Sequence, residues 1–269
     1  VTSHGLDQYR CWGIRFEYGV LTNISHEHLD YHKTLERYLQ AKLKLIRSAK
    51  IAVLNRNDSS FKSARAAARG KIVTFSDKPD FMAANNNAAM AVALDLGIDR
   101  AKIGAALAAF SGVTGRMEVV QEKPFKIVID FAHKPDALEK ALRFLRRNLK
   151  GRIIAVFGCA GLRDWLKRPM MGEISGRLAD VTILTAEDPR TENVNEIIQQ
   201  IKAGFKSKKK LYSEPDRQKA INLAIKLARP GDIVGLFGKS HEKSMCFGTI
   251  ESAWSEHQAV KKALKLCNY

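Results

Sequence analysis

Short apolar runs alternate with longer amphipathic segments through the second half of the chain. The apolar runs predict strands over residues 125–130, 152–157, 181–184 and 233–237, and near residue 211. The segments between them have apolar residues at helical spacing and predict helices over 135–149, 169–178, 194–205 and 216–228. This alternation predicts an α/β fold, a parallel sheet covered by helices on both faces. Ligands of such sheets bind beyond the carboxyl ends of the strands, so functional residues are expected there.

The first half is patterned less regularly. Its apolar runs predict strands over 51–54 and 72–75. Its helical spacing predicts helices over 34–47, 61–68, 85–96 and 100–110. The small and polar residues at 111–115 (SGVTG) mark the best domain boundary, so domains are expected over 1–111 and 112–269.

Composition narrows the class of protein. Apolar residues make up 45% of the 269, which excludes a disordered or fibrous chain. No apolar run reaches the roughly 18–20 residues that span a bilayer, and none resembles a secretory leader. The four cysteines form no C-x-x-C pair, so a disulfide framework and a structural zinc site are not indicated, and a reducing, cytoplasmic setting is expected. The chain begins at Val1 inside a polar motif and is interpreted as a fragment.

The formal charge of +17 favours a polyanionic ligand. It does not distinguish nucleic acid from a nucleotide or a multiply anionic metabolite. The positive residues do not alternate with aromatic residues, as a platform for stacking bases would require. The densest basic run, 206–210, is interpreted as a solvated loop.

The first polar cluster follows an apolar run and spans residues 26–32 (HEHLDYH), just after Thr22 and Asn23. Three histidines and two acids in seven residues offer ligands for a divalent cation. The alternative is a polar loop whose histidines only cap or hydrogen-bond.

Lys42 lies on the apolar stripe of the next predicted helix. That stripe contains Leu35, Tyr38, Leu39 and Ile46 at helical spacing. A buried ammonium is costly unless it is paired or modified. Lys42 is therefore either a lysine that extends from the edge of the stripe to water or a group with a chemical role beside the histidine cluster.

Three further polar clusters follow strands of the second half. The Gly-rich turn at 158–164 leads into a helix and is a weak candidate for holding an anion at the helix N-terminus. Arg168 and Arg190 are candidates to clamp a carboxylate by bidentate pairing, although residues 187–190 are equally compatible with a plain Asp-Pro turn. Residues 238–242 contain G-K-S, but the phosphate-loop motif needs Gly at 233, where the chain has Ile233. The sequence therefore contains no Walker A loop.

Eight motifs occur in an order that resembles the Mur ligases. They are 3–10 (SHGLDQYR), 22–23 (TN), 28–32 (HLDYH), 115–118 (GRME), 130–133 (DFAH), 167–169 (KRP), 188–190 (DPR) and 238–242 (GKSHE). Each motif is weak alone, whereas their joint order is specific. The chain is most similar to the branch that adds the third amino acid, usually meso-diaminopimelate, to UDP-N-acetylmuramoyl-L-alanyl-D-glutamate.

The resemblance implies a fold and a reaction. The fold is a central, ATPase-type domain with a truncated parallel sheet over 1–111, followed by a Rossmann-like C-terminal α/β domain over 112–269. In this family ATP phosphorylates a carboxylate of the substrate with the help of Mg²⁺, and the incoming amine then displaces phosphate from the acyl phosphate. A truncated sheet leaves apolar edges uncovered, so the first domain is expected to be the less stable one.

The resemblance also assigns residues of the first domain. Thr2, Gln8 and Arg10 match positions that contact the muramoyl peptide. His28 matches a magnesium ligand, and Lys42 matches a lysine that carbon dioxide converts to a carbamate, an anionic ligand for the metal.

In the second domain the resemblance assigns a nucleotide site and an amino-acid pocket. The nucleotide contacts are Asn23, from the first domain, with Arg116, Asp130 and His133. Arg190 matches the residue that grips the distal carboxylate of diaminopimelate. The amino-acid pocket comprises Arg168, Glu187, Asp188, Pro189, Arg190, Gly238 and Glu242.

Several positions depart from the pattern of the family. The N-terminal uridine-nucleotide domain, the phosphate loop, a Glu expected before Val1 and about forty residues before Phe81 are absent. The family usually has Ser at Thr2, Asn at Met82, Asp at Leu162, Lys-Gly at 165–166 and Gly at Ser240. It also has Asn at Asp188, where the extra carboxylate is expected to repel a diacid and attract an amine.

Three hypotheses for function follow. The first is an ATP-dependent amide ligase of peptidoglycan synthesis, monomeric at full length and with no nucleic-acid or membrane partner, of which this chain alone is inactive. The second is a truncated relative that only binds amino acid or nucleotide, or complements another chain. The third is a nucleic-acid-binding module.

Overall fold

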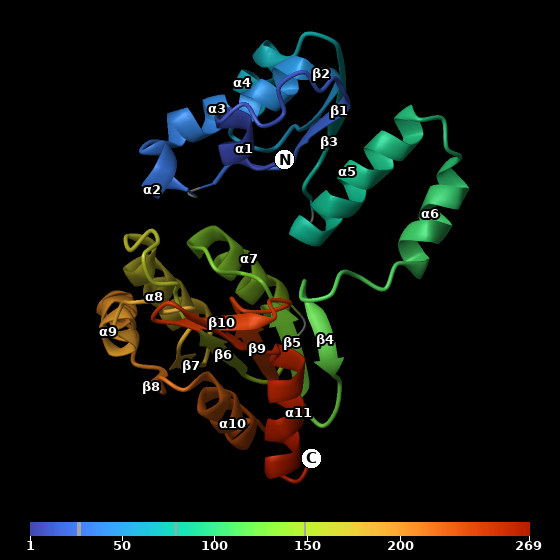
Figure 1. Ribbon diagram of the computed structural model, residues 1–269. Coiled ribbons are helices and arrows are strands. Elements are labelled where there is room, and N and C mark those ends of the chain that lie inside the picture. Colours follow the sequence, from blue (N-terminus) through green and yellow to red (C-terminus); the bar gives the residue numbers. More distant parts are fainter. Residues whose placement is uncertain (26–27, 79, 148) are drawn as a thin grey trace. The chain divides into compact units, whose positions relative to one another are not determined.

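The computed structural model describes residues 1–25, 28–78, 80–147 and 149–269 (Figure 1). The chain divides into two compact units, Val1–Ser111 and Gly112–Tyr269, each with its own sheet. The boundary lies within the small-residue stretch at 111–115. The two units are described in turn.

The first unit is a small three-stranded sheet with helices. Its elements are α1 (Ser3–Asp7), β1 (Phe16–Leu21), α2 (Leu29–His32), α3 (Leu35–Ser48), β2 (Ala49–Asn55), α4 (Phe61–Ala67), β3 (Lys71–Phe75), α5 (Phe81–Asp95) and α6 (Arg100–Ala109). The strands lie in the order β1-β2-β3 and are all parallel. The core on one face is formed with α3 and α4, and the core on the other face with α5.

Helix α3 forms because its start is capped and its apolar residues share one face. The hydroxyl of Thr34 accepts a hydrogen bond from the backbone N–H of Arg37. The buried face contains Tyr38, Leu39, Leu43 and Ile46. The predicted stripe is thus confirmed except at its start, where Leu35 is 47% exposed. Lys42 is half-buried at the edge of this face.

The second unit is built around a six-stranded sheet. Its elements are β4 (Glu118–Gln121), β5 (Lys126–Asp130), α7 (Pro135–Arg146), β6 (Ile153–Phe157), α8 (Lys167–Leu178), β7 (Val181–Leu184), α9 (Val194–Gly204), β8 (Lys210–Ser213), α10 (Arg217–Leu227), β9 (Ile233–Phe237), β10 (Ser244–Phe247), β11 (Ile250–Ala253) and α11 (Glu256–Leu266). The strand order is β4-β5-β9-β6-β7-β8, and only β4 runs antiparallel to its neighbour.

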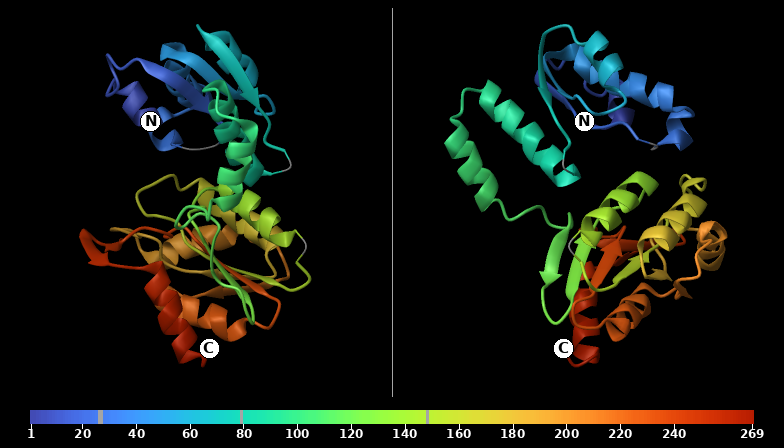
Figure 2. Two further views of the ribbon diagram at one scale, coloured as in Figure 1. Left: turned by 90° about the vertical axis from the view of Figure 1, so that its right-hand side faces the viewer. Right: turned by 180° about the vertical axis from the view of Figure 1, so that it is seen from behind.

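Helices cover both faces of this sheet, as the alternating sequence pattern predicts (Figure 2). One core packs α7, α8 and α9 against the sheet, and the other packs α10 and α11 against the opposite face. Strand β5 shows the reason, because Ile127 and Ile129 enter one core and Val128 enters the other. The predicted α/β class with parallel sheets is therefore confirmed in both units.

The elements that the sequence pattern missed lie at the edges. Strand β4 is a short, half-buried edge strand, and all four residues of β11 are exposed, so neither carries an apolar run. Helix α11 was also missed. Helix α7 ends three residues earlier than predicted, because Arg147 adopts an extended conformation.

Helices α8 and α9 pack in unusually close contact, which fixes the start of α8. A Cβ at Gly172 would overlap the carbonyl oxygen of Ile201, and a Cβ at Gly204 would overlap that of Pro169. Only glycine permits this separation. The contact matters for function because α8 begins with Lys167 and Arg168.

We expect Gly172→Ala to lower the free energy of unfolding of the second unit by about 1–3 kcal/mol, because backbone must move to admit the methyl group. The measurement is urea denaturation followed by hydrogen exchange of the β6 amides. Gly104→Ala is the matched control. Gly104 is an exposed helical glycine with open space around its Cβ position, so the change is expected to stabilise α6 by about 0.5–1 kcal/mol. Equal effects of the two changes would contradict the packing argument.

Candidate functional site

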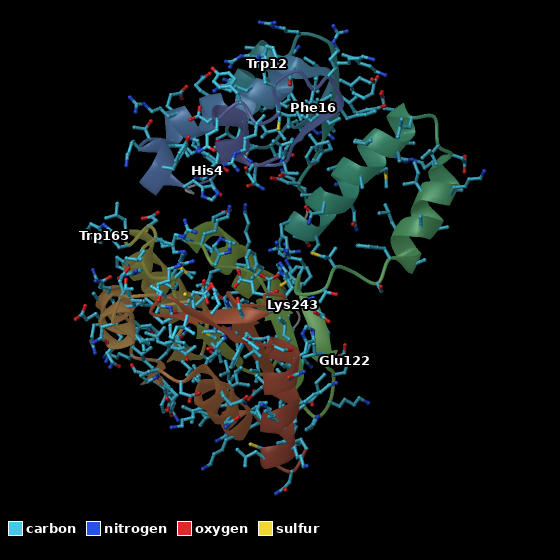
Figure 3. All side chains as sticks on the ribbon, in the orientation of Figure 1. His4, Trp12, Phe16, Glu122, Trp165 and Lys243 are labelled. Carbon is cyan, nitrogen blue, oxygen red and sulfur yellow. The ribbon has the colours of Figure 1, made fainter. Side chains whose placement is uncertain are left out.

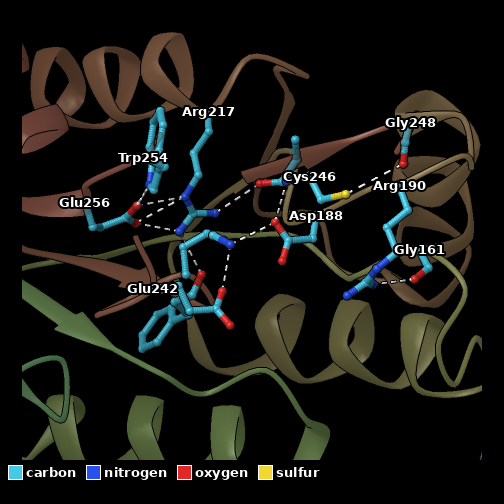
Figure 4. Close-up of polar contacts among 12 residues, drawn as sticks. Gly161, Asp188, Arg190, Arg217, Glu242, Cys246, Gly248, Trp254 and Glu256 are labelled. Atoms are coloured by element: carbon cyan, nitrogen blue, oxygen red, sulfur yellow. Dashed lines mark hydrogen bonds and ion pairs between the residues drawn. The ribbon is translucent and has the colours of Figure 1, made fainter. Parts of the chain in front are cut away.

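The loops after β5, β6, β7 and β9 meet at the carboxyl edge of the second sheet. The backbone N–H of Gly161 donates to the carbonyl of Asp188 at 2.9 Å, and that of Gly238 donates to the carbonyl of Asp130 at 3.1 Å. The Nη1 of Arg190 donates to the carbonyl of Gly161 at 2.7 Å (Figure 4). Residues 130–133, 158–168, 187–190 and 238–242 are called the strand-tip site below.

Four residues of the strand-tip site other than glycine have left-handed backbone. Their φ angles are 55° at Leu162, 41° at Asp188, 51° at Arg190 and 51° at Ser240. Each such residue costs on the order of 1 kcal/mol and persists only where its surroundings determine it. At Ser240 the hydroxyl donates to the carbonyl of Gly115 at 2.5 Å, which offsets the strain at a position where Gly is usual in the family the sequence resembles. Strain of this kind gathers at ligand sites.

A buried lysine connects two acids of the site. The Nζ of Lys239, with no exposed side-chain surface, lies 2.8 Å from Asp188 Oδ1 and 2.7 Å from Glu242 Oε2. Asp188 Oδ1 also accepts the backbone N–H of Cys246 at 3.0 Å. The extra carboxylate at Asp188 is thus paired with Lys239, and its effect on the choice of amino acid stays a prediction.

Glu187 is the acid with the most perturbed ionisation. Its side chain is buried, and Oε2 has no hydrogen-bond partner within the described ranges. A Cβ at Gly238, whose φ is +102°, would overlap this carboxyl group. Burial raises the pKa of Glu187 to about 7, although the positive charges of Lys167 and Arg217 oppose the shift. Near neutral pH Glu187 is therefore present in both its protonated and its ionised form.

The two arginines predicted to clamp a carboxylate have different surroundings. Arg168 is buried and already paired with Glu192, at 2.8 Å between Nη1 and Oε2 and 3.1 Å between Nη2 and Oε1. Its Nη1 also donates to Gln200. Arg190 is half-buried and forms no ion pair with a carboxylate in the described part of the chain. Arg190 is thus the guanidinium available to a ligand, and direct binding by Arg168 stays a prediction.

The predicted nucleotide contacts of the second unit also gather. The carboxylate of Asp130 accepts the backbone N–H groups of Met117 and Ala132, at 2.8 and 2.9 Å. Burial raises the pKa of Asp130. The guanidinium of Arg116 lies 4.5 Å from the ring centroid of Phe131, and the ring of His133 lies 4.6 Å from the same ring. These contacts place the exposed guanidinium of Arg116 against the half-buried ring of Phe131, which is part of the strand-tip site.

A cluster of aromatic side chains lies in the first unit. Its rings belong to His4, His28, Tyr31, His32 and Tyr38. The centroids of neighbouring rings lie 4.2–6.2 Å apart. His4 lies on α1 beside α2 (Figure 3). The ring of His32 is buried and shares a hydrogen bond with the hydroxyl of Ser3 at 2.9 Å.

The predicted substrate contacts of the first unit lie around this cluster. Thr2 caps α1 by accepting the N–H of Gly5 at 3.0 Å. The side-chain amide of Gln8 donates to the Tyr31 hydroxyl at 3.4 Å. Arg10 and Asn23 are exposed. The structure therefore places Gln8 near the histidines, while the roles of all four residues stay predictions.

The predicted magnesium ligands share an aromatic neighbour. The His28 ring centroid lies 6.2 Å from that of Tyr38, and Lys42 Nζ lies 5.9 Å from the same centroid. His26 and Glu27, from the predicted ligand run, lie outside the described residues. Among the residues that are described, no group of three or more His, Cys, Asp or Glu side chains is arranged so that it could hold a metal ion. The donor set suits a divalent cation only if Lys42 is carbamylated, since an ammonium would repel the metal.

Sequence reasoning missed several residues of these sites. Lys239 was seen only as a member of the 238–242 motif and was given no role, Glu192 and Arg217 belonged to no motif, and His4 was not connected to the later histidines. The shared signal is a charged residue next to an apolar strand or helix. That pattern predicts that the charged residue is buried, but it does not indicate which residue it contacts.

Comparison with known proteins agrees with the motifs. Residues 1–106 match the family model of the Mur ligase middle domain, and residues 115–240 match that of the Mur ligase glutamate ligase domain. The chain belongs to the Mur ligase family. It is 38% identical over 98% of its length to the UDP-N-acetylmuramoyl-L-alanyl-D-glutamate–2,6-diaminopimelate ligase of Aquifex aeolicus, and 37% identical over 98% to that of Thermosynechococcus vestitus.

Solved structures place this Mur ligase chain in the same fold. A structure of a UDP-N-acetylmuramoyl-L-alanyl-D-glutamate–2,6-diaminopimelate ligase aligns with a TM-score of 0.59 and 30% identity, covering the whole chain and 64% of the other. The MurF ligase of Thermotoga maritima in complex with ADP has a TM-score of 0.70 at 19% identity, covers 96% of the chain and 64% of that protein, and shows likeness of fold alone.

The chain spans about 62% of the length of the two curated relatives named above. The match to the Aquifex protein runs over 299 positions, which is 30 more than the 269 residues of the chain, so the relative has extra residues inside the matched region. Across the described residues, no helix is both long and apolar enough to cross a membrane.

The raised pKa of Glu187 predicts a pH dependence of stability. Between about pH 4.5 and 7 the folded chain keeps a proton that the unfolded chain releases, so the contribution of Glu187 to stability falls as the pH rises. We expect Glu187→Gln to abolish a decrease on the order of 3 kcal/mol across this window. The measurement is urea denaturation at several pH values. Glu173→Gln, an exposed carboxyl on α8, is the control and should retain the wild-type profile; an unchanged profile in the Glu187 variant would contradict the assignment.

Proposed function

We propose that this chain is the catalytic part of an ATP-dependent amide ligase of peptidoglycan precursor synthesis. The reaction joins a diamino acid, meso-diaminopimelate, to UDP-N-acetylmuramoyl-L-alanyl-D-glutamate through an acyl phosphate. The supporting observation is the strand-tip site, where Lys239 joins the loop that carries Glu187, Asp188 and Arg190 to Glu242. The guanidinium of Arg190 forms no ion pair with a carboxylate among the described residues. The relatives at 35–38% identity carry this activity in their names.

The charges of the strand-tip site suit a diamino diacid. Arg168 is paired with Glu192, and Lys239 is shared by Asp188 and Glu242, so these groups leave one net negative charge around Lys239. Arg190 supplies the positive charge for a distal carboxylate through bidentate hydrogen bonds. Glu242, which is partly exposed, is the acceptor for the distal ammonium group. A monocarboxylic diamino acid would leave Arg190 without its partner.

The other assignments complete the proposal. Arg116, Asp130 and His133 contact the nucleotide together with Asn23, and Arg116 and Phe131 offer a cation and a ring to it. Thr2, Gln8 and Arg10 orient the muramoyl peptide. His28 and carbamylated Lys42 would hold Mg²⁺, which when bound neutralises charge on the phosphate groups. The proton of the attacking ammonium group must be lost before the amine displaces phosphate.

A second candidate is a chain that binds amino acid or nucleotide without turnover. The observation in its favour is that the 269-residue sequence contains no complete phosphate loop, because Ile233 stands where the motif of Gly238 and Lys239 needs glycine. We propose accordingly that this chain by itself releases no phosphate from ATP, whereas a protein that supplies the loop does so when muramoyl dipeptide and amino acid are both present.

We expect Arg190→Met to weaken binding of meso-diaminopimelate about 10–100-fold, because a charged hydrogen bond to its distal carboxylate is lost. L-Lysine lacks that carboxylate, so its weaker binding should change less than twofold. Isothermal titration calorimetry of the 269-residue chain measures both. Arg177→Met, which makes the same change at the far end of α8, is the control and should bind like wild type. An equal loss for both amino acids would contradict the role of Arg190.

Lys42 is expected to carry a carbamate. In ¹³C-labelled bicarbonate at about pH 8, the chain should show a carbamate carbonyl signal by NMR that is absent from Lys42→Arg. Lys44→Arg is the matched control on the same helix. Lys44 is paired with Asp7 at 3.0 Å, which holds it as an ammonium, so this change should leave the signal in place. A wild-type chain without the signal would remove the basis for a metal site at Lys42.

A further inference from the structure

Arg217 is a buried guanidinium that belongs to none of the motifs assigned above. It is the first residue of α10, on the face of the sheet opposite α8, and its side chain is 2% exposed. Neighbouring charges raise its pKa, chiefly that of Glu256, so it is a permanent buried cation. In Figure 4 its guanidinium lies between Glu256 and the loop that carries Asp188.

The guanidinium of Arg217 donates to the ends of two strands that lead into the strand-tip site. Its Nη1 donates to the carbonyl of Ala186 at 3.2 Å, and its Nη2 donates to the carbonyl of Phe237 at 2.9 Å. Ala186 directly precedes Glu187, and Phe237 directly precedes Gly238. A single guanidinium therefore holds the residues that directly precede the 187–190 and 238–242 loops, which carry the acidic residues of the strand-tip site.

The two strands that lead into these loops, β7 and β9, are not neighbours in the sheet. Strand β6 lies between β7 and β9, so no ladder hydrogen bond sets the distance between their ends. Arg217 bridges them across the end of β6. The close approach of Gly238 to the carboxyl of Glu187 requires that this distance be held, because even a methyl group would overlap there.

The guanidinium of Arg217 is also held by the carboxylate of Glu256. Its Nε donates to Glu256 Oε1 and Oε2 at 3.2 and 3.0 Å, and its Nη2 donates to Oε1 at 2.5 Å. Glu256 is fully buried and also accepts the indole N–H of Trp254 at 2.8 Å. The orientation of the Arg217 guanidinium is thus set by a residue of α11, outside the strand-tip site.

The same domain contains a comparable pair at the other edge of the sheet. Arg152 donates to Asp232 Oδ2 at 2.6 and 3.1 Å and to the carbonyl of Leu227 at 2.8 Å. These residues lie just before β6 and β9, at the amino ends of the strands, away from the strand-tip site. The pair stabilises the sheet without touching any loop of the pocket, which makes it a matched reference.

We propose that Arg217 is a positioning residue for selection of the amino acid, holding the 187–190 and 238–242 loops at the separation at which their acids and Arg190 form one pocket. This inference rests on the proposed function for the identity of the ligand. The geometric part, the spacing of the loops and the charge that Glu187 experiences, does not depend on it.

The test uses the 269-residue chain with Arg217→Lys and the double change Arg217→Met with Glu256→Gln, which leaves no buried charge unpaired. The first readout is binding of meso-diaminopimelate by calorimetry. The second is the ¹³C titration of the Glu187 carboxyl, assigned with Glu187→Gln. Arg152→Lys, and the double change Arg152→Met with Asp232→Asn, are the controls for a general loss of stability.

We expect the double change at 217 and 256 to weaken binding at least tenfold and to move the titration midpoint of Glu187 upward, because a nearby cation is lost. Arg217→Lys keeps the charge but cannot span both carbonyls and the carboxylate. It should therefore retain the midpoint of Glu187 while weakening binding by an intermediate factor. The control changes should leave both readouts within twofold of wild type.

Two results would overturn the positioning role. One is folded Arg217 variants that keep the wild-type affinity and titration, and the other is Arg152 variants that alter both readouts equally. If the wild-type chain binds no diaminopimelate, the proposed function fails, and the Glu187 titration still decides whether Arg217 sets the environment of that loop.

Discussion

The strand-tip site depends on the placement of Lys239 between Asp188 and Glu242. A lysine without exposed side-chain surface is tolerated only because two carboxylates lie within 2.8 Å of its Nζ. This arrangement binds the loop after β7 to the loop after β9 and balances the charge of Asp188. It also brings a left-handed Ser240 against Gly115 at the start of the second unit. Burial of one cation thus determines how three segments of the chain meet.

The remaining charges divide into those that hold the protein together and those left for a ligand. Arg168 with Glu192 and Arg217 with Glu256 form ion pairs inside the protein, although the buried Nε of Arg168 has no hydrogen-bond partner among the described residues. Arg190 forms only a backbone contact in the described residues, and Glu187 has a buried oxygen without a partner. Unsatisfied polar groups of this kind are rare in folded proteins and indicate a ligand site. This partition leaves groups of both signs of charge at the site, and the proposal of a diamino diacid as the ligand rests on it.

The motifs named the residues that make up the strand-tip site, but they did not rank them. The residue pattern gave Arg168 and Arg190 the same role, as two candidates to clamp one carboxylate. The structure separates them because Glu192 and Gln200, from a later segment, occupy the guanidinium of Arg168. Asp188 shows the same limit. The sequence predicts that its carboxylate repels a diacid, and the structure adds that this carboxylate is paired with Lys239, which is fifty-one residues away in sequence and 2.8 Å away in space.

The sequence by itself determined the fold class, the positions of most helices and strands, and the family. These follow from short-range patterns, because burial on a strand or helix face is decided by residues one to four positions apart. Only the tertiary structure decided which charges cancel, which arginine remains available and which carboxyl keeps its proton near neutral pH. Those properties depend on distances between loops from different strands, and the electrostatic energy of a buried group is set by such neighbours. They cannot be read from the order of residues along the chain.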